Sequence, residues 1–419
     1  IEFSDWSSDV CSSDLKSVKM KDCVRAVSFL FVVASAVVWT VGEGARIPPT
    51  FVVDLDQPPR ERWRQTYQTL FADAEVRAAF STTIGSALRT FAEAQCDRNC
   101  LEALAATFQR RFPEYYEELA GMREGAGLTL SQEELVAAQF QYEFSMARAP
   151  RTGRAGVAES NNNEDDAYAA ALQLPLGAVL GCTSVLTCAA DGAVLHGRNL
   201  DWSDAQAFAR GLISVNYTRG GVLVFQSEQL LGTVGVLTGV RRGAFSLSLN
   251  ARREQPYRTR DELLACAARV PLTPVLAGYR HHLEHSADYG AVVANLTRTG
   301  TCAPRYSIVG GPRAGVRIQY NNSRAPGDDA PVLDVERLAC DDNRWFVAQC
   351  NSDFGTPLQK DVRRRLVIAD LEASGRAAAA TPKGLLHAMS VNLVRNAKTI
   401  HTTIMSPDTG RILTVAYDS

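Results

Sequence analysis

Residues 181–202 read GCTSVLTCAADGAVLHGRNLDW and hold most of the chemistry that the sequence shows. Cys182 opens an apolar run, an Asp-Gly pair follows at 191–192, and a second run ends in Arg198 and Asp201. Two such runs around an Asp-Gly pair predict a β-hairpin. Antiparallel pairing would return Arg198 and Asp201 to the neighbourhood of Cys182. The stretch therefore predicts a thiol, a guanidinium and a carboxylate in one pocket.

The same residues also fit a purely structural interpretation. Cysteine is often a small buried apolar side chain, and Arg198 with Asp201 would then form an ordinary ion pair. Spacing alone supports the catalytic and the structural interpretations about equally.

Downstream of the hairpin the pattern mixes strands with a few helices. Short or alternating apolar runs bounded by glycine and Asx residues predict strands, and longer segments with three- and four-residue apolar spacing predict helices. The predicted helices are 261–268, 275–284 and 360–374. The predicted strands are 183–187, 194–198, 213–217, 221–226, 245–250, 306–309, 316–320, 345–350, 401–405 and 412–417.

Residues 58–146, upstream of the hairpin, follow a helical pattern. Ser131 with Glu134 three residues later predicts a helix start, and the apolar run 135–144 follows it. Residues 148–166 are rich in Gly, Ala, Asn and charge without periodicity, which predicts a flexible loop. A helical first half joined through such a loop to a β-rich second half suggests a pro-segment that precedes a catalytic unit. The clearest helical segments of the first half are 60–74, 76–94 and 101–112.

The N-terminal residues have the pattern of a leader and an export signal. Residues 1–19 contain the near-duplicates SSDV and SSDL, which indicates a non-native leader, and we expect Met20 to be the true start. Residues 20–45 carry Lys21 and Arg25, then an apolar run and a small-residue exit, as a signal peptide does. The alternative is a membrane anchor, but the run is shorter than the ~20 residues that a spanning helix needs. We therefore expect a lysosomal or secreted protein.

Two further features fit the secretory pathway. N-glycosylation sequons begin at Asn216, Asn295 and Asn321. Of the ten cysteines, Cys11 and Cys23 lie in the leader and signal segments, which leaves eight. An oxidising compartment would permit disulfides among these eight, and the sequence leaves their pairing open.

Composition and charge exclude several classes of protein. Lys and Arg number 44 against 46 Asp and Glu, a net charge of -2, so no basic excess suggests nucleic-acid binding. Cys96 and Cys100 have no second ligand pair at zinc spacing. His281, His282 and His285 also lack partners, so we expect a solvated helix face there. We expect neither a metal nor an organic cofactor.

Cys-Thr-Ser at 182–184, with Gly-Arg-Asn-Leu-Asp at 197–201, resembles the acid ceramidase and N-acylethanolamine acid amidase family. This family belongs to the cholylglycine hydrolase group of N-terminal nucleophile enzymes. The resemblance covers nearly all residues from about 46 to the C-terminus. The other blocks that resemble the family, in the same order, are 47–63, 112–144 with Tyr-Glu-Phe at 142–144, 237–250, 308–311 and 344–351.

The resemblance implies an α+β fold, the four-layer αββα sandwich of N-terminal nucleophile hydrolases, with a helical N-terminal pro-segment. It also implies a self-cut before Cys182. The products would be an α subunit of residues 46–181 and a catalytic β subunit of residues 182–419, held together as a heterodimer.

Carried over residue by residue, the resemblance implies six catalytic residues. Cys182 is the nucleophile, with Arg198 and Asp201 beside it. The other three are the oxyanion-site asparagines Asn250 and Asn351 and a C-terminal active-site arginine, Arg363, for which Arg364 is the alternative register.

The chemistry requires a base for the Cys182 thiol, and no histidine is placed to serve. His196 lies on the return strand but matches no catalytic position. The freed α-amine of Cys182 can take the proton, because an α-amine and a thiol titrate within about one pH unit of each other. Asp201 would orient that amine and Arg198 would favour the thiolate. An acyl-thioester then forms, and water hydrolyses it without a cofactor.

Three features depart from the family pattern. Ala251 stands where relatives have a glutamate, and Glu254 is the nearest acid. Residues 145–181 are an insertion relative to the family. Gly181 precedes the expected cut, where relatives have a larger residue. These departures bear on self-cleavage more than on the hydrolase assignment.

We expect hydrolysis of the amide bond of a lipid amide at acid pH, and both ceramide and an N-acylethanolamine fit. The enzyme would meet its lipid at a membrane surface or through a lipid-presenting protein. One alternative is an acylase for another amide, of bile-salt or penicillin type. The other is an uncleaved, inactive lipid-binding relative, which Ala251 and the insertion would favour. The sequence does not choose between a sphingoid and an ethanolamine head group.

Overall fold

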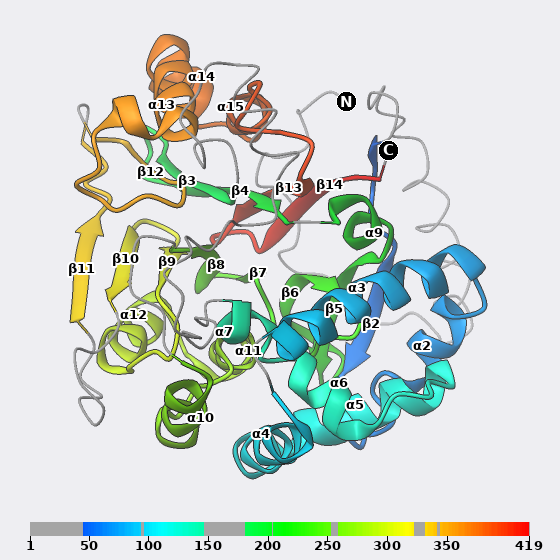
Figure 1. Cartoon of the computed structure of the whole chain (residues 1–419). Helices are drawn as coiled ribbons and strands as arrows, with labels where there is room; N and C mark the ends of the chain where they lie inside the picture. The colour runs from blue at the N-terminus through cyan, green and yellow to red at the C-terminus, as the bar shows by residue number, and fades with distance from the viewer. Residues whose placement is uncertain are drawn as a thin grey trace, which may run out of the picture.

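A computed structural model describes residues 45–93, 96–145, 181–202, 204–252, 259–321, 332–341 and 344–418. Two β-sheets lie stacked at its centre, and helices cover their outer faces (Figure 1). This arrangement of sheets and helices confirms the expected α+β fold class.

The six-stranded sheet carries the predicted hairpin. Its neighbouring strands are all antiparallel, and Ser184 on β3 lies opposite Arg198 on β4. Gly192 in the connecting turn has φ 86°, a backbone conformation that favours glycine. The strand order is β1 (Ala45–Arg46), β14 (Arg411–Tyr417), β13 (Thr399–Ser406), β4 (Val194–Asp201), β3 (Thr183–Cys188) and β12 (Phe346–Gln349).

The eight-stranded sheet is antiparallel except at one edge, where β2 pairs with β5 in parallel. Its order is β11 (Val332–Arg337), β10 (Gly315–Asn321), β9 (Arg305–Gly310), β8 (Phe245–Ala251), β7 (Thr238–Arg241), β6 (Val222–Leu230), β5 (Leu212–Arg219) and β2 (Thr50–Asp54).

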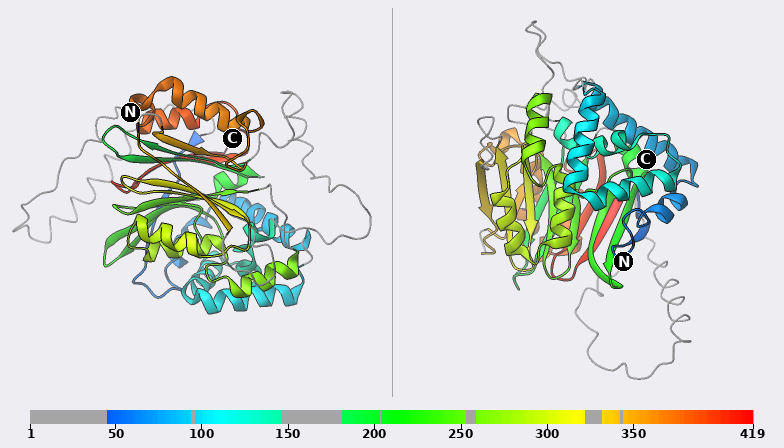
Figure 2. Two further views of the ribbon diagram at one scale, coloured as in Figure 1. Left: turned by 90° about the vertical axis from the view of Figure 1, so that its left-hand side faces the viewer. Right: turned by 90° about the horizontal axis from the view of Figure 1, so that it is seen from below.

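The helices form the two outer layers. In the left view of Figure 2, α13 (Val362–Ser374), α14 (Arg376–Ala379) and α15 (Pro382–Met389) cover the outer face of the six-stranded sheet. The helices on the far side of the eight-stranded sheet come from the N-terminal half and from the middle of the chain. They include α2 (Arg64–Leu70), α3 (Ala74–Glu93), α4 (Arg98–Arg111), α5 (Pro113–Ala126), α6 (Gln132–Ala138), α7 (Gln141–Ser145), α10 (Arg260–Arg269), α11 (Val275–His285) and α12 (Tyr289–Arg298).

Strand periodicity explains how β3 holds these layers together. Val185 packs in a core with Leu385 and Met389 of α15. Leu186, one residue on, packs with Tyr306 and other residues of the opposite sheet. Successive side chains of a strand point to opposite faces. Even-numbered residues of β3 therefore face the second sheet, and odd-numbered residues face the helices.

Every strand and helix predicted for the second half is confirmed, within a few residues at the ends. The predicted helix start at Ser131 is also confirmed, with a capping box to Glu134. The apolar run 135–144 is divided between two helices, since α6 ends at Ala138 and α7 begins at Gln141. Between the two helices, the Gln139 side chain donates a hydrogen bond to the carbonyl oxygen of Gly232 and accepts one from the main-chain N–H of Val234. Both partners belong to the second half of the chain. Strands β1, β2, β7 and β11 and helices α9 (Ala205–Arg210), α12, α14 and α15 were not predicted.

The predicted solvated histidine face on α11 is wrong in one residue. His282 is buried, its Nδ1 lies 3.2 Å from Ser286 Oγ, and burial lowers its pKa to about 4. His281 is half-buried and only His285 is exposed. α11 packs its His282 side inward, because that side continues the apolar stripe of the helix.

Several predictions lie wholly or mostly outside the described residues: the leader, the signal peptide, the 148–166 loop and most of the insertion. Asn216 lies on β5, Asn295 on α12 and Asn321 at the end of β10, and their glycosylation stays a prediction. In the part of the chain that is described, no helix is long and apolar enough to cross a bilayer.

Six of the eight remaining cysteines form disulfides. The pairs are Cys96–Cys100, Cys188–Cys340 and Cys266–Cys302, whereas Cys182 and Cys350 are free and buried. The sequence left this pairing open. The one thiol with a predicted chemical role is thus kept out of the disulfide framework.

Glu228 on β6 gives the fold a testable pH dependence. Its buried carboxylate accepts hydrogen bonds from Ser214 Oγ at 3.0 Å and Thr414 Oγ1 at 2.8 Å. Burial raises the pKa of Glu228 to about 7, against the lowering effect of these hydroxyls and Arg46. The Glu228 carboxyl binds its proton more tightly in the folded protein than in the unfolded chain. Its contribution to the free energy of unfolding is therefore fully present below the unfolded-state pKa. This contribution is lost as the pH rises through about 7.

Glu228→Gln keeps the shape of the protonated acid but does not titrate. We expect its melting temperature, relative to wild type, to rise progressively between about pH 5 and about pH 8. Thermal unfolding at a series of pH values measures this, with the exposed Glu102→Gln as control. Wild-type and Glu228→Gln curves that stay parallel across the series would contradict the expectation.

Candidate active site

Cys182 directly precedes β3 and is 5% exposed. Its Sγ accepts a hydrogen bond from Arg198 Nη2 at 3.0 Å. Arg198 reaches the thiol because it lies opposite Ser184, which shares the inner face of the sheet with Cys182. A guanidinium beside a thiol favours the thiolate. The predicted return of Arg198 to Cys182 is therefore seen in the structure.

Asn250 on β8 of the opposite sheet holds Arg198 in place. Its Oδ1 accepts from Arg198 Nη1 at 2.5 Å and from Ser184 Oγ at 2.8 Å. Its Nδ2 donates to main-chain carbonyls, those of Gln349 at 2.8 Å, Cys350 at 3.1 Å and Cys182 at 3.4 Å. The amide thus binds the main chain of Cys182 and, through Arg198, its side chain.

Arg363 of α13 approaches Cys182 from the helix side of the sheet. Its Nη1 donates to the carbonyl oxygen of Gly181 and, at 3.0 Å, to that of Cys182. Its Nη2 donates to Asn351 Oδ1 at 2.8 Å. The carbonyl of the peptide bond before Cys182 is therefore bound by a cation.

Arg364, the alternative register, lies elsewhere. Its guanidinium donates to the carbonyl oxygens of Asp353, at 3.1 Å, and of Thr356. Its main-chain N–H is bound by Asp361, which caps the start of α13. This cap fixes the rotation of the helix, so the structure brings Arg363 rather than Arg364 to Cys182.

Asp201 ends β4 on the same side as Arg363. Its Oδ1 accepts from Thr399 Oγ1 at 2.8 Å, and its Oδ2 accepts from Asn396 Nδ2 at 3.1 Å and lies 3.6 Å from Arg363 Nη1. Burial raises the pKa of Asp201 to about 6, although Arg363 and the two hydrogen bonds act to lower it. Asp201 can therefore change its protonation state in mildly acidic solution.

Asn351 follows β12 and lies directly against Gly181. Its Nδ2 donates to Ala251 O at 2.6 Å. Gly181 has φ 122°, and a Cβ added there would lie 2.1 Å from Asn351 Oδ1. Only glycine fits this position without moving Asn351, which gives a physical reason for the small residue before the expected cut.

The six predicted residues thus meet around the start of β3. Sequence reasoning missed Ser184, Thr399 and Asn396, which orient Asn250 and Asp201. Ser184 carries a usable signal, because it lies two residues after Cys182 on the same strand face. No group of three His, Cys, Asp or Glu side chains suited to a metal occurs among the described residues.

Comparisons with known proteins agree with one another. A family model described as the beta subunit of N-acylethanolamine-hydrolyzing acid amidase matches residues 46–88. The N-acylethanolamine-hydrolyzing acid amidase of Caenorhabditis elegans is 28% identical over 366 residues, which cover 87% of this chain and 90% of that protein. Acid ceramidase of Mus musculus is 26% identical over 384 residues, which cover 87% and 84%.

A solved structure described as a Caenorhabditis elegans N-acylethanolamine-hydrolyzing acid amidase ortholog is 31% identical, covers 54% of this chain and 93% of that chain, and has a TM-score of 0.47. The chain belongs to the N-acylethanolamine-hydrolyzing acid amidase and acid ceramidase family. The family model's name calls residues 46–88 the beta subunit. The same segment precedes Cys182 and lies within residues 46–181, the expected α subunit.

Membership in this family of amidases makes the surroundings of Ala251 of interest. Ala251 offers no carboxylate, and its main-chain oxygen is bound by Asn351. The acid of this site, among the described residues, is Asp201, which the neighbouring Arg363 reaches.

Proposed function

We propose that the chain is an N-terminal nucleophile hydrolase that cuts itself between Gly181 and Cys182 and then hydrolyses the amide bond of a lipid amide. One observation carries this proposal. The Cys182 thiol is bound by Arg198 while the Gly181 carbonyl beside it is bound by Arg363. A nucleophile and an activated carbonyl thus lie next to each other in one buried site.

Self-cleavage is the first proposed step. Cys182 Sγ attacks the carbonyl carbon of Gly181, and Arg363 stabilises the negative charge that develops on the oxygen. The C–N bond breaks, the nitrogen takes the proton lost by the thiol, and a thioester remains. Water hydrolyses the thioester, which yields a Gly181 carboxylate and a Cys182 with a free α-amine.

The free α-amine then serves the second reaction. It takes the thiol proton, Asp201 orients it, and Arg198 favours the thiolate that attacks the substrate amide. Departure of Gly181 would uncover Asn351, whose amide would bind the oxyanion of the substrate, while Asn250 would hold Arg198 in place. The amide C–N bond then breaks, and the leaving amine takes the proton that the α-amine holds. Water releases the acyl group from Cys182 as a carboxylic acid, so the steps need no cofactor.

Gly181→Ala tests the geometry of the cut. The added Cβ strains a backbone at φ 122° and displaces Asn351, so the carbonyl should leave Arg363. We expect two-chain formation to slow about tenfold, since such strain costs about 1–3 kcal/mol. The appearance of two chains on a denaturing gel over time measures the rate.

Gly127→Ala is a matched control for this variant. Gly127 also has a positive φ, 62°, but nothing lies within 4 Å of an added Cβ. It should lower the melting temperature and leave the cleavage rate unchanged. Equal cleavage rates for Gly181→Ala and wild type would contradict the proposed geometry.

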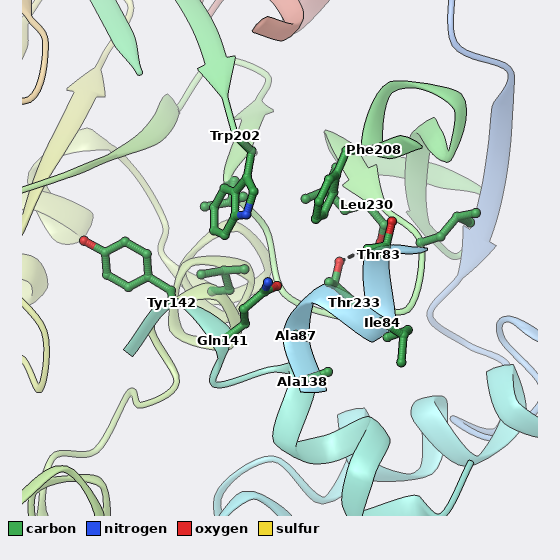
Figure 3. Close-up of a pocket in the computed structure, with 13 residues that line it drawn as sticks. Thr83, Ile84, Ala87, Ala138, Gln141, Tyr142, Trp202, Phe208, Leu230 and Thr233 are labelled. Carbon is green, nitrogen blue, oxygen red and sulfur yellow. Dashed lines mark hydrogen bonds between the residues drawn. The ribbon is translucent and has the colours of Figure 1, made fainter. Parts of the chain in front are cut away.

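An apolar pocket lies beside the site. Its free volume is about 20 Å³, and it is lined by side chains of both halves, among them Ile84, Ala138, Phe208 and Trp202 (Figure 3). Trp202 directly follows Asp201, so the pocket starts next to the proposed chemistry. The lining is mostly apolar, as in pockets that bind apolar ligands, but its free volume is little more than that of one water molecule, so an acyl chain would bind there only after the pocket widens.

A buried ionic cluster supports the proposed heterodimer. Arg280 of α11 and Glu118 of α5 pair through both carboxylate oxygens, and both side chains are fully buried. Glu118 also accepts from Arg62 and Trp63. Burial acts to raise the pKa of Glu118, but Arg280 and Arg62 outweigh it and hold the pKa low. The pair would therefore persist at acid pH and keep residues 46–181 bound to residues 182–419.

The remaining expectations belong to the same proposal. Two stacked sheets with helices on their outer faces (Figure 1) support the αββα sandwich of N-terminal nucleophile hydrolases. Passage through the secretory pathway to a lysosomal or extracellular destination is supported by the three disulfides, because disulfides persist in oxidising compartments.

Hydrolysis of ceramide, palmitoylethanolamide, a conjugated bile salt and penicillin V at acid pH tests the substrate class. We expect turnover of a lipid amide only. Turnover of only the bile salt or penicillin would instead identify an acylase of that type. An uncut chain that binds lipid without turnover would identify a lipid-binding relative.

A further inference from the structure

A row of polar side chains connects His196 to the Cys182 site. His196 lies fully buried on β4, and its Nε2 is 2.9 Å from Ser248 Oγ. Ser248 Oγ lies 2.9 Å from Ser184 Oγ, which lies 2.8 Å from Asn250 Oδ1. The row runs between the two sheets, from β4 to β8, across to β3 and back to β8.

Donor and acceptor chemistry gives the row one direction. Asn250 Oδ1 is an acceptor only, so the Ser184 hydroxyl donates to it. The Ser184 oxygen then accepts from Ser248, and the Ser248 oxygen accepts from the Nε2–H of His196. Nδ1 of His196 is left without a proton and accepts from Ser246 Oγ at 2.9 Å.

This direction agrees with the way the Asn250 amide faces. With Oδ1 toward Ser184 and Arg198, Asn250 accepts from two donors and its Nδ2 meets carbonyl oxygens. A reversed amide would set its NH2 against the guanidinium and leave the carbonyls facing an oxygen. Arg198 would then lose its 2.5 Å contact with Asn250, and its place against Cys182 Sγ would depend on its bond to Leu249 O and its 3.4 Å contact with Ser184 Oγ.

We propose that His196 is a positioning residue for the Cys182 thiol. It donates from Nε2 through Ser248 and Ser184, orients Asn250, and so keeps Arg198 against Sγ. The inference rests on the proposed role of Cys182 as nucleophile. It gives a function to a histidine that is too far along the row to act as a base itself.

The surroundings keep His196 in the form that the row needs. Burial and the nearby Arg198 charge lower the pKa of His196 to about 3. The ring therefore stays neutral in the acid range, with one nitrogen free to accept from Ser246. A second positive charge next to Arg198 would be costly in this core.

Two serines of β8 provide a matched test. Ser248 and Ser246 are both fully buried and both bind His196, but only Ser248 lies on the row to Asn250. The readout is the rate at which iodoacetamide alkylates Cys182 across a pH series, assigned by peptide mass. Burial raises the pKa of Cys350, the other free thiol among the described residues, to about 12, so Cys350 should react little.

We expect Ser248→Ala to move the pH of half-maximal alkylation up by about one unit, because the thiolate loses a well-placed guanidinium. Ser246→Ala should leave it unchanged. His196→Leu should match Ser248→Ala, and His196→Gln, whose amide can donate from the Nε2 position, should restore most of the wild-type profile. A purely structural role would lower the melting temperature of the variants without moving the profile.

The outcomes separate this inference from the proposed function. Identical profiles for Ser248→Ala and Ser246→Ala, with Cys182 reactive in wild type, would overturn the positioning role and leave the nucleophile in place. A wild-type Cys182 that resists alkylation, together with full amidase activity of Cys182→Ala, would overturn both.

Discussion

Replacing Cys182 by alanine is expected to leave the precursor as one polypeptide without amidase activity. The change deletes a single sulfur atom that both proposed reactions require, while Arg198, Asn250 and Arg363 keep their main-chain partners. Purified wild type should show two chains, and N-terminal sequencing of the C-terminal chain should begin Cys-Thr-Ser-Val. Denaturing gels and an assay of lipid-amide hydrolysis measure the two losses.

Cys350→Ala is the matched control, since Cys350 is also a free, buried cysteine in the part of the chain that the structure describes. Its Sγ meets only Thr183 Oγ1, at 3.6 Å, among the hydrogen bonds seen. We expect Cys350→Ala to be cut and active, at some cost in stability from a small cavity. An uncut wild-type chain with full activity would contradict the mechanism, because the amine that acts as base would still be part of a peptide bond.

Local patterns predicted the hairpin, whereas the order of the strands in the sheets could not be predicted. The β3–β4 pairing depends on neighbouring residues and an Asp-Gly turn, which a short window of sequence contains. β12 and β13 flank this hairpin from more than a hundred residues away, and no local signal encodes that pairing. Tertiary contacts also overrode a local pattern at Gln139, which ends α6 to bind the second half.

The site residues also divide into those that local sequence could predict and those that it could not. The register between β3 and β4 is enough to place Arg198 beside Cys182. This could be predicted because the two strands are adjacent in sequence. Asn250, Asn351 and Arg363 lie on separate elements, so only resemblance to a family could nominate them. The roles of Ser184 and His196 needed the structure, because which hydroxyl meets which amide depends on how the two sheets stack.

Arg363→Ala is expected to slow both self-cleavage and lipid-amide hydrolysis by about 100- to 1,000-fold, the usual effect of removing an oxyanion donor. Arg363 binds the Gly181 carbonyl, where charge would develop during the cut, and it also holds Asn351 and Asp201. Rates of two-chain formation and of hydrolysis by the chains that do form measure the two effects separately.

Arg364→Ala distinguishes this role from the general loss of a buried arginine. Arg364 is the next residue on α13 and is also buried, but its bonds go to the carbonyls of Asp353 and Thr356. Removing it leaves those carbonyls short of a donor, so we expect a loss of about 1–3 kcal/mol in stability with cleavage at the wild-type rate. If Arg364→Ala stops cleavage while Arg363→Ala cuts normally, α13 must instead be rotated so that Arg364 faces Cys182. If both variants cut normally, the charge on the Gly181 oxygen must be stabilised by other donors.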